Sequence, residues 1–208
     1  MKAADKDYVV DLYNKSLADY GDTAEGVKWR PYSQSYRFKV LTQVADLETA
    51  SILDYGCGKG DLYPYLVGQG FRGTYTGFDI NSQLIDLARR KYAGVRFEIK
   101  DIEEVESLSE QFDYVLVSGV FAFGLHASDS WSVMKSVLSR CFTVAKKGLA
   151  FNAISTYVTY REPEFFYASP EEVFQFCMTE LSRNVALRHE NVPCNFTVYV
   201  YRKPEWNH

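Results

Sequence analysis

Long hydrophobic runs are absent from this 208-residue sequence, and so is any excess of basic residues. No run is long enough for a membrane-spanning helix, which needs about 20 mainly apolar residues. The first twenty residues carry charges throughout, so they lack the apolar core of a secretory signal. These absences predict a cytoplasmic protein that does not cross a membrane.

Paired cysteines are missing as well. The four cysteines are widely spaced, and with only three histidines they form neither a disulfide framework nor a zinc ligand set. Lys and Arg number 23 against 27 Asp and Glu, a formal charge of -4, which argues against a protein that binds nucleic acid through a basic face. We therefore expect no metal and no nucleic-acid partner. The oligomeric state is left open.

Aromatic residues, in contrast, are abundant: the sequence has 16 Tyr, 14 Phe and 3 Trp. Two interpretations of this abundance remain open. The aromatic rings fill a large core, or some of them line a ligand pocket, since such pockets are mostly apolar with a few placed polar groups.

Most of the chain predicts strands that alternate with helices. The pattern places strands at 51–55, 74–80, 95–100, 112–118 and 148–154, and helices at 61–67, 82–92 and 130–145. A helix over 169–181 and two strands at 185–189 and 196–201 follow, and two amphipathic helices at 1–20 and 33–47 come first. We predict a single α/β domain over 1–208. Residues 1–48 form an N-terminal helical lid, and residues 49–208 form a Rossmann-like core. The core has a seven-stranded, mostly parallel sheet that ends in an antiparallel C-terminal hairpin, with helices on both faces.

The most informative segment joins the first of these strands to a helix through alternate glycines, Gly56, Gly58 and Gly60. Glycine permits positive φ and lets a ligand approach the backbone closely. Asp79 follows at the end of the next strand, 19 residues beyond Gly60, which is the spacing at which an acid binds ribose hydroxyls. Asp79 is alternatively the N-cap of the helix that begins at Asn81.

The glycine spacing does not suit a nicotinamide dinucleotide, whose loop reads G-x-G-x-x-G. Asp54 precedes the turn, and its carboxylate repels a pyrophosphate but suits an ammonium group. The ligand that these residues imply carries adenosine at one end and an amino-acid group at the other. S-adenosylmethionine meets this description.

With these motifs the sequence resembles the class I S-adenosylmethionine-dependent methyltransferases. The D-x-G-x-G-x-G pattern is complete at 54–60, Asp79 and Asp101 follow the second and third predicted strands, and FDYVLVSG forms the fourth. The resemblance covers 51–201 and extends to a less-characterised, small-molecule subgroup. It implies an enzyme with S-adenosylmethionine as cofactor and S-adenosylhomocysteine (SAH) as product.

The resemblance also implies roles for individual residues. The glycine turn contacts the methionine end, Asp54 lies near the ammonium, Asp79 holds the ribose, and Asp101 bonds the adenine amino group; Asp101 is alternatively a solvated turn residue. The implied cofactor-binding residues are Asp54, Gly56, Cys57, Gly58, Gly60, Asp79, Ile80, Asp101, Ile102, Ser118 and Gly119. Cys57 is small enough for the turn and is not read as a nucleophile.

Acceptor residues are expected beyond the carboxyl ends of the strands, where ligands bind an open α/β sheet. His126, in the loop after the fourth strand, is the candidate general base, or alternatively a loop residue or helix cap. The aromatic segment 156–167 forms either a flap over the acceptor or a loop pinned to the sheet. The predicted substrate-binding residues are Tyr13, Trp29, Arg37, Phe121, Phe123, Asn152, Tyr157, Tyr160 and Tyr167.

The acceptor class follows from what the fourth strand lacks. Branches that methylate adenine or cytosine carry N/D-P-P-Y/F after this strand, where this sequence reads SGVF, and no basic module is appended. We therefore predict methyl transfer to an oxygen or nitrogen of a small molecule, with the atom left open. The alternatives are an RNA or protein methyltransferase and a non-catalytic scaffold that binds S-adenosylmethionine.

Overall fold

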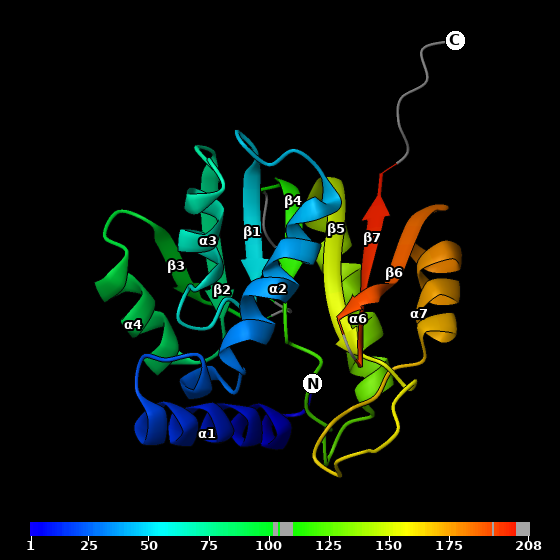
Figure 1. The fold of residues 1–208 in the computed structure, drawn as a ribbon, viewed down its shortest axis with the longest axis horizontal. Helices are drawn as coiled ribbons and strands as arrows, with labels where there is room; N and C mark the ends of the chain where they lie inside the picture. The colour runs from blue at the N-terminus through cyan, green and yellow to red at the C-terminus, as the bar shows by residue number, and fades with distance from the viewer. Residues whose placement is uncertain (102–103, 105–109, 193, 203–208) are drawn as a thin grey trace.

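A seven-stranded sheet in the order β3-β2-β1-β4-β5-β7-β6 forms the centre of the computed structural model, which describes residues 1–101, 104, 110–192 and 194–202 (Figure 1). The first five strands run parallel, and β7 pairs antiparallel with both β5 and β6. The seven-stranded Rossmann-like sheet predicted from the sequence is therefore confirmed. The strands are β1 (Ser51–Tyr55), β2 (Thr74–Asp79), β3 (Arg96–Ile99), β4 (Phe112–Val117), β5 (Ala145–Ile154), β6 (Asn184–Val192) and β7 (Asn195–Tyr201).

Helices cover both faces of this sheet, because side chains that alternate along each strand point to opposite faces. In β4, Val115 and Val117 pack into the core under α6, whereas Leu116 packs into the core under α2, α3 and α4. The helices are α1 (Ala3–Tyr20), α2 (Pro31–Leu41), α3 (Leu62–Gly68), α4 (Ser82–Lys91), α6 (Ser130–Val144) and α7 (Pro170–Phe176), with short turns η1 (Glu25–Val27), η2 (Thr42–Val44) and η3 (Cys177–Leu181).

The strand order reverses between β1 and β4, which lie side by side although β2 and β3 come between them in the sequence. Such a reversal leaves a crevice beyond the carboxyl ends of the two strands, where open α/β sheets bind their ligands. Figure 1 shows α1 lying across this edge of the sheet, below the ends of the parallel strands. The fold thus places the N-terminal helix over the predicted binding site.

Several predicted boundaries differ from those observed. The predicted helix over 33–47 ends at Leu41, where the Thr42 hydroxyl donates to the Phe38 carbonyl and the chain tightens into η2. β5 begins at Ala145 instead of residue 148, because its first residue pairs with Phe112 of β4. The predicted helix over 169–181 divides into α7 and the π-helical turn η3. β6 runs on to Val192. No helix in the described ranges is both long and apolar enough to cross a membrane.

Candidate functional site

The three glycines of the turn after β1 adopt positive φ, but they serve different purposes. A Cβ on Gly56 would lie 2.2 Å from Val120 Cγ2, and one on Gly60 would lie 2.8 Å from Phe97 Cζ, so both positions are filled by packed side chains. A Cβ on Gly58 would meet nothing nearer than 3.9 Å. The backbone of Gly58 lines the cavity without a tight contact on its Cβ side, so a ligand has room to contact the main chain there.

Asp79, at the end of β2, joins this turn to α4. Its Oδ2 accepts a hydrogen bond from the Gly58 N–H at 2.8 Å, and its Oδ1 accepts one from the Asn81 N–H at 2.8 Å. The side chain that caps α4 is that of Asn81, which accepts from the Leu84 N–H at 3.1 Å, so Asp79 is not the N-cap. Burial raises the pKa of Asp79, while the backbone N–H groups oppose this rise.

Asp54 is a buried carboxylate on β1. It accepts a hydrogen bond from the Tyr75 hydroxyl at 2.5 Å. Burial raises the pKa of Asp54 to about 7, with smaller contributions from Asp79 and Asp61. No Lys or Arg pairs with Asp54 among the described residues, so a cationic ligand group beside it would favour its ionised form.

A cavity at the carboxyl edge of the sheet brings many of the predicted residues together. The predicted cofactor residues that line it are Asp54, Gly56, Cys57, Gly58, Asp79, Ile80, Asp101, Ser118 and Gly119, and the predicted acceptor residues are Tyr13, Trp29, Phe121 and Phe123. Seven predicted residues do not line it: Gly60, Arg37, His126, Asn152, Tyr157, Tyr160 and Tyr167. Ile102 lies outside the described residues.

Asn152 shapes the cavity from behind instead of lining it. Its Oδ1 accepts from the Gly119 N–H at 3.0 Å, and its Nδ2 donates to Ser118 Oγ at 3.0 Å. Both partners belong to the turn after β4, and both line the cavity. The buried amide of Asn152 therefore holds this turn in place.

Trp29 lies directly on Gly119, where only glycine leaves room for it. A Cβ on Gly119 would stand 2.6 Å from Trp29 Cζ2. The guanidinium of Arg37 lies over the Trp29 ring, 4.6 Å from its centre, and Arg37 Nε donates to Asn195 Oδ1 at 3.2 Å. Burial lowers the pKa of Arg37 to about 10.

His126 is exposed and lies outside the cavity. Its ring stands edge-on to Tyr8 with centroids 4.5 Å apart, and its backbone N–H, like that of Ala127, donates to Asp5 Oδ1 at 2.9 Å. Asp5 is buried near the start of α1, so this contact ties the helix to the loop after β4.

The aromatic segment 156–167 lies partly on the loop after β4. The Phe166 N–H donates to the Ala122 carbonyl at 2.9 Å, and the rings of Phe123 and Phe165 lie 5.3 Å apart. Two of the predicted tyrosines point elsewhere, since Tyr157 is 64% exposed and Tyr160 is 72% exposed. The Tyr157 hydroxyl donates to Glu171, and the Tyr167 hydroxyl accepts from the Glu162 N–H at 2.8 Å. These contacts favour a pinned loop.

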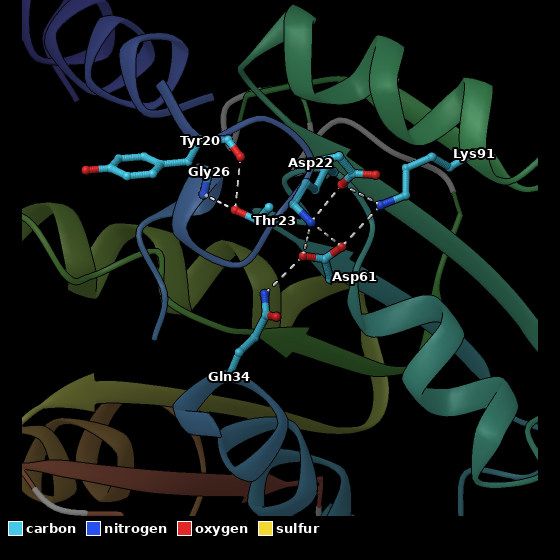
Figure 2. A network of polar contacts seen from close by, with 8 residues as sticks. Tyr20, Asp22, Thr23, Gly26, Gln34, Asp61 and Lys91 are labelled. Carbon is cyan, nitrogen blue, oxygen red and sulfur yellow. Dashed lines mark hydrogen bonds and ion pairs between the residues drawn. The ribbon is translucent and has the colours of Figure 1, made fainter. Parts of the chain in front are cut away.

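A network of charged side chains beside the glycine turn was not anticipated from the sequence. Lys59 is buried, and its Nζ lies 2.7 Å from Asp61 Oδ2 and 2.9 Å from Asp22 Oδ1. Lys91 Nζ also lies 2.9 Å from Asp22 Oδ1, and Gln34 Nε2 donates to Asp61 Oδ2 at 3.0 Å. Figure 2 shows this network joining α2, the glycine turn, α4 and the chain after α1.

The network attaches the N-terminal segment to the core. Thr23 Oγ1 donates to the Tyr20 carbonyl and accepts from the Gly26 N–H, which braces the connection around Asp22 (Figure 2). Partial burial opposes ionisation of Asp22, but hydrogen bonds from Lys91 and Lys59 keep its pKa below the usual value. The K-x-D pair at 59 and 61 was a visible local signal, whereas no sequence pattern indicated Asp22 as its partner.

Asp101, the last described residue before a gap, forms an ion pair with Lys6 of α1. Its side chain is half-buried and lines the cavity. The predicted adenine contact thus lies beneath α1 and next to a cation. This arrangement is not that of a fully solvated turn.

The chain as a whole is similar to known methyltransferases. A family model described as a methyltransferase domain matches residues 47–191. A Mycobacterium tuberculosis protein named as a methyltransferase (Rv1506c) is 30% identical over 157 residues, which cover 72% of this chain and 92% of that protein. A fatty-acid O-methyltransferase of Mycolicibacterium smegmatis is 38% identical over 74 residues, 35% of this chain and 27% of that protein.

Solved structures share the fold at low sequence identity. One is magnesium protoporphyrin IX methyltransferase (ChlM) from Synechocystis PCC 6803, crystallised with bound SAH. It matches with a TM-score of 0.69 at 16% identity, over 96% of this chain and 100% of that one.

Replacing Asp54 by Asn is expected to stabilise the free protein in a pH-dependent way. Because the pKa of this carboxyl rises on folding from 3.8 to about 7, its contribution to stability is complete below pH 4 and is lost as the pH rises to about 7. Asp54→Asn should therefore exceed the parent by roughly 4 kcal/mol in free energy of unfolding at pH 8 and nearly match it at pH 4, measured by urea unfolding.

Asp113→Asn is the matched control, because the pKa of Asp113 is shifted in the opposite direction from that of Asp54. The Ser51 backbone N–H and Lys147 hold the pKa of Asp113 below its usual value, so Asp113→Asn should be less stable than the parent at pH 8 and equal to it in acid. A stability difference for Asp54→Asn that does not change with pH would contradict the assignment.

Asp22→Asn is expected to loosen the N-terminal segment. Partly exposed ion pairs are worth about 1 kcal/mol at most, so amide exchange in α1 and η1 should accelerate by up to about five-fold. High salt should remove the difference from the parent, because salt screens exposed pairs. Asp19→Asn makes the same charge change at an exposed position on α1 and should have no effect. Equal exchange in both variants would show that the network does not hold this segment.

Proposed function

Because this chain belongs to the methyltransferase-domain family, we propose that it transfers a methyl group from S-adenosylmethionine to an oxygen or nitrogen of a small-molecule acceptor. The chain is an enzyme, and S-adenosylmethionine is its cofactor. The observation that carries the proposal is the cavity in which Asp54, Asp79 and the uncovered backbone of Gly58 meet. We propose the acceptor of the methyl group, the acceptor atom and the residue roles that follow.

The residues present fit such a cofactor. The space beside Gly58, which a Cβ would enter, suits a ligand that lies against the backbone. Each carboxylate oxygen of Asp79 accepts one backbone N–H bond and keeps a further lone pair. These remaining lone pairs accept hydrogen bonds from the ribose hydroxyls. Asp54 binds the amino-acid ammonium, and Asp101 accepts from the adenine amino group.

The cofactor supplies a sulfonium methyl, and the protein's share of the work is alignment and the exclusion of water. Ser118 and Gly119, held by Asn152, form the wall where the methyl lies. Trp29 covers Gly119 from the side of the N-terminal segment. These residues form one side of the proposed reaction space.

A small molecule is the acceptor class that the surroundings favour. Residues of α1, Val27 of η1 and the loop after β4 line the cavity, and a cavity with walls on these sides suits a small molecule better than a folded macromolecule. The names of ChlM and of the fatty-acid O-methyltransferase both state small acceptors. An RNA or protein acceptor is the alternative, and it requires the N-terminal segment to swing away from the cavity.

Calorimetric titration with SAH tests the cofactor assignment, with NAD as the control ligand. We expect the parent to bind SAH and not NAD. Asp79→Asn should weaken SAH binding by at least roughly tenfold, since a hydrogen bond to a charged group is worth about 1.5–3 kcal/mol. Circular dichroism should show the fold intact. An Asp79→Asn affinity equal to that of the parent would remove the ribose role.

His126→Ala tests the general-base role predicted for His126. The imidazole is exposed and packs on Tyr8 outside the cavity, so we expect turnover within about two-fold of the parent. The measurement is kcat with an identified acceptor at saturating cofactor. A loss of about a hundredfold or more, with SAH affinity retained, would instead establish His126 as the base.

A further inference from the structure

One part of the cavity extends away from the carboxylates and is apolar. The side chains that line it come from the loop after β4, from α6 and from the segment that pairs with that loop. We call this part the apolar arm, and its walls are Phe121, Phe123, Leu125, Val133, Val137 and Phe166.

The arm reaches the surface at α6. Ser136 on α6 is exposed at its far end, and a shallow hollow shares Val133 and Ser136 with it. Hydrogen bonds from the Gly124 N–H to the Glu164 carbonyl at 2.8 Å and from the Phe166 N–H to Ala122 fix its outer wall. The arm therefore suits an extended apolar group whose tail reaches solvent.

The Tyr13 ring lies 6.0 Å from that of Phe123, but burial raises the pKa of its hydroxyl, which therefore stays protonated at neutral pH. No other titratable side chain of the described cavity residues offers a proton acceptor to this arm. The proposed function assigns Asp79 and Asp101 to the cofactor, and Asp61 pairs with Lys59. Asp54 faces the glycine turn and is bonded to Tyr75. The Ser130 hydroxyl in the arm accepts from the Leu125 N–H at 3.0 Å. An acceptor that binds here must therefore arrive with its nucleophilic atom already deprotonated.

A cation behind Trp29 favours an anion over an ammonium at Gly119. Arg37 is half-buried, and no carboxylate of a described residue pairs with it. One ring, that of Trp29, separates its guanidinium from Gly119. In a medium of low dielectric constant, a cation at this range attracts an anion at Gly119 and repels a protonated amine.

We propose that the acceptor is a carboxylic acid with an extended apolar chain, bound as the carboxylate at Gly119 with its chain in the apolar arm, and that the product is its methyl ester. This inference rests on the proposed function and names the acceptor class for the same site. A carboxylic acid is ionised at neutral pH without help, since its pKa lies near 4 to 5.

The reaction balances without a base. A lone pair on a carboxylate oxygen forms the new O–C bond to the methyl carbon, and the C–S bond breaks with its electron pair passing to sulfur. The sulfonium becomes a neutral thioether, and the carboxylate becomes a neutral ester. No proton is gained or lost.

The test compares acceptors of one chain length with the intact enzyme and S-adenosylmethionine. Dodecanoate, dodecanol and dodecylamine are the probes, butanoate is the short-chain control, and mass spectrometry identifies the products. We expect methyl dodecanoate alone, with kcat/KM at least about tenfold above that for butanoate, because each buried methylene adds about 0.8 kcal/mol. The saturated rate should be flat from pH 6.5 to 9, since no proton is removed.

Variants test the charge at position 37 and the arm separately. Arg37→Gln should lower kcat/KM for dodecanoate by roughly tenfold, Arg37→Lys should restore part of it, and the exposed Arg30→Gln should not change it. A structural role for Arg37, through its stacking on Trp29, predicts equal losses for Gln and Lys. Val133→Phe should reduce activity toward dodecanoate and spare butanoate.

The outcomes separate this inference from the proposed function. Failure of the parent to bind SAH would overturn both. Binding of SAH together with methylation of the alcohol or the amine, or of none of the probes, would overturn the carboxylic acid and leave the cofactor assignment intact. A rate that rises steadily with pH would also overturn it, because it would show that a proton must leave the acceptor.

Discussion

The carboxylate of Asp79 is the constraint on which the site depends. By accepting from the N–H groups of Gly58 and Asn81, it joins the end of β2, the glycine turn and the start of α4. Asn81 extends the connection to α1, because its Nδ2 donates to Asn14 Oδ1 at 2.9 Å and to the Val10 carbonyl at 3.3 Å. One acidic side chain thus positions the turn, and through its neighbour it positions the helix that covers the cavity. A ligand that donates hydrogen bonds to this carboxylate therefore contacts a preorganised site.

Burial destabilises the ionised form of two acidic side chains at this site. Asp54 and Asp79 both have a raised pKa because of burial, so the empty cavity is less stable than one lined by neutral groups. The acids beside Lys59 behave differently, since Asp22 is stabilised as an anion by two lysines. The site therefore has two parts. The ion pairs of Asp22 attach the N-terminal segment to the core, whereas Asp54 and Asp79 have no basic partner among the described residues and would be stabilised as anions by a bound cation. Destabilised buried acids of this kind are expected at a site whose residues serve ligand binding and not the stability of the fold.

Most of the fold could be predicted from the sequence because its signals are local. Each strand and helix between 51 and 154 has its own periodicity, and the glycine turn and Asp79 are short-range motifs. Contacts between distant segments carry no such signal. The pairing of Asp22 with Lys59 and the placement of Asn152 behind Ser118 appear only when the chain is folded. For His126 the local signal gave a wrong expectation. Its position in the loop after β4 predicted a side chain in the cavity, but its ring packs against Tyr8 instead.

The position of Arg37 agrees with the requirements of a reaction between two opposite charges. A carboxylate and a sulfonium become neutral as the methyl moves, so charge decreases on the way to the transition state, and surroundings of low dielectric constant favour the reaction. A guanidinium bonded directly to the carboxylate would stabilise the ground state more than the transition state and would slow this step. Behind Trp29, the same cation still attracts an incoming anion but does not share its lone pairs. An apolar arm, a ring-shielded arginine and the lack of a base in the described cavity are therefore consistent parts of one chemical arrangement.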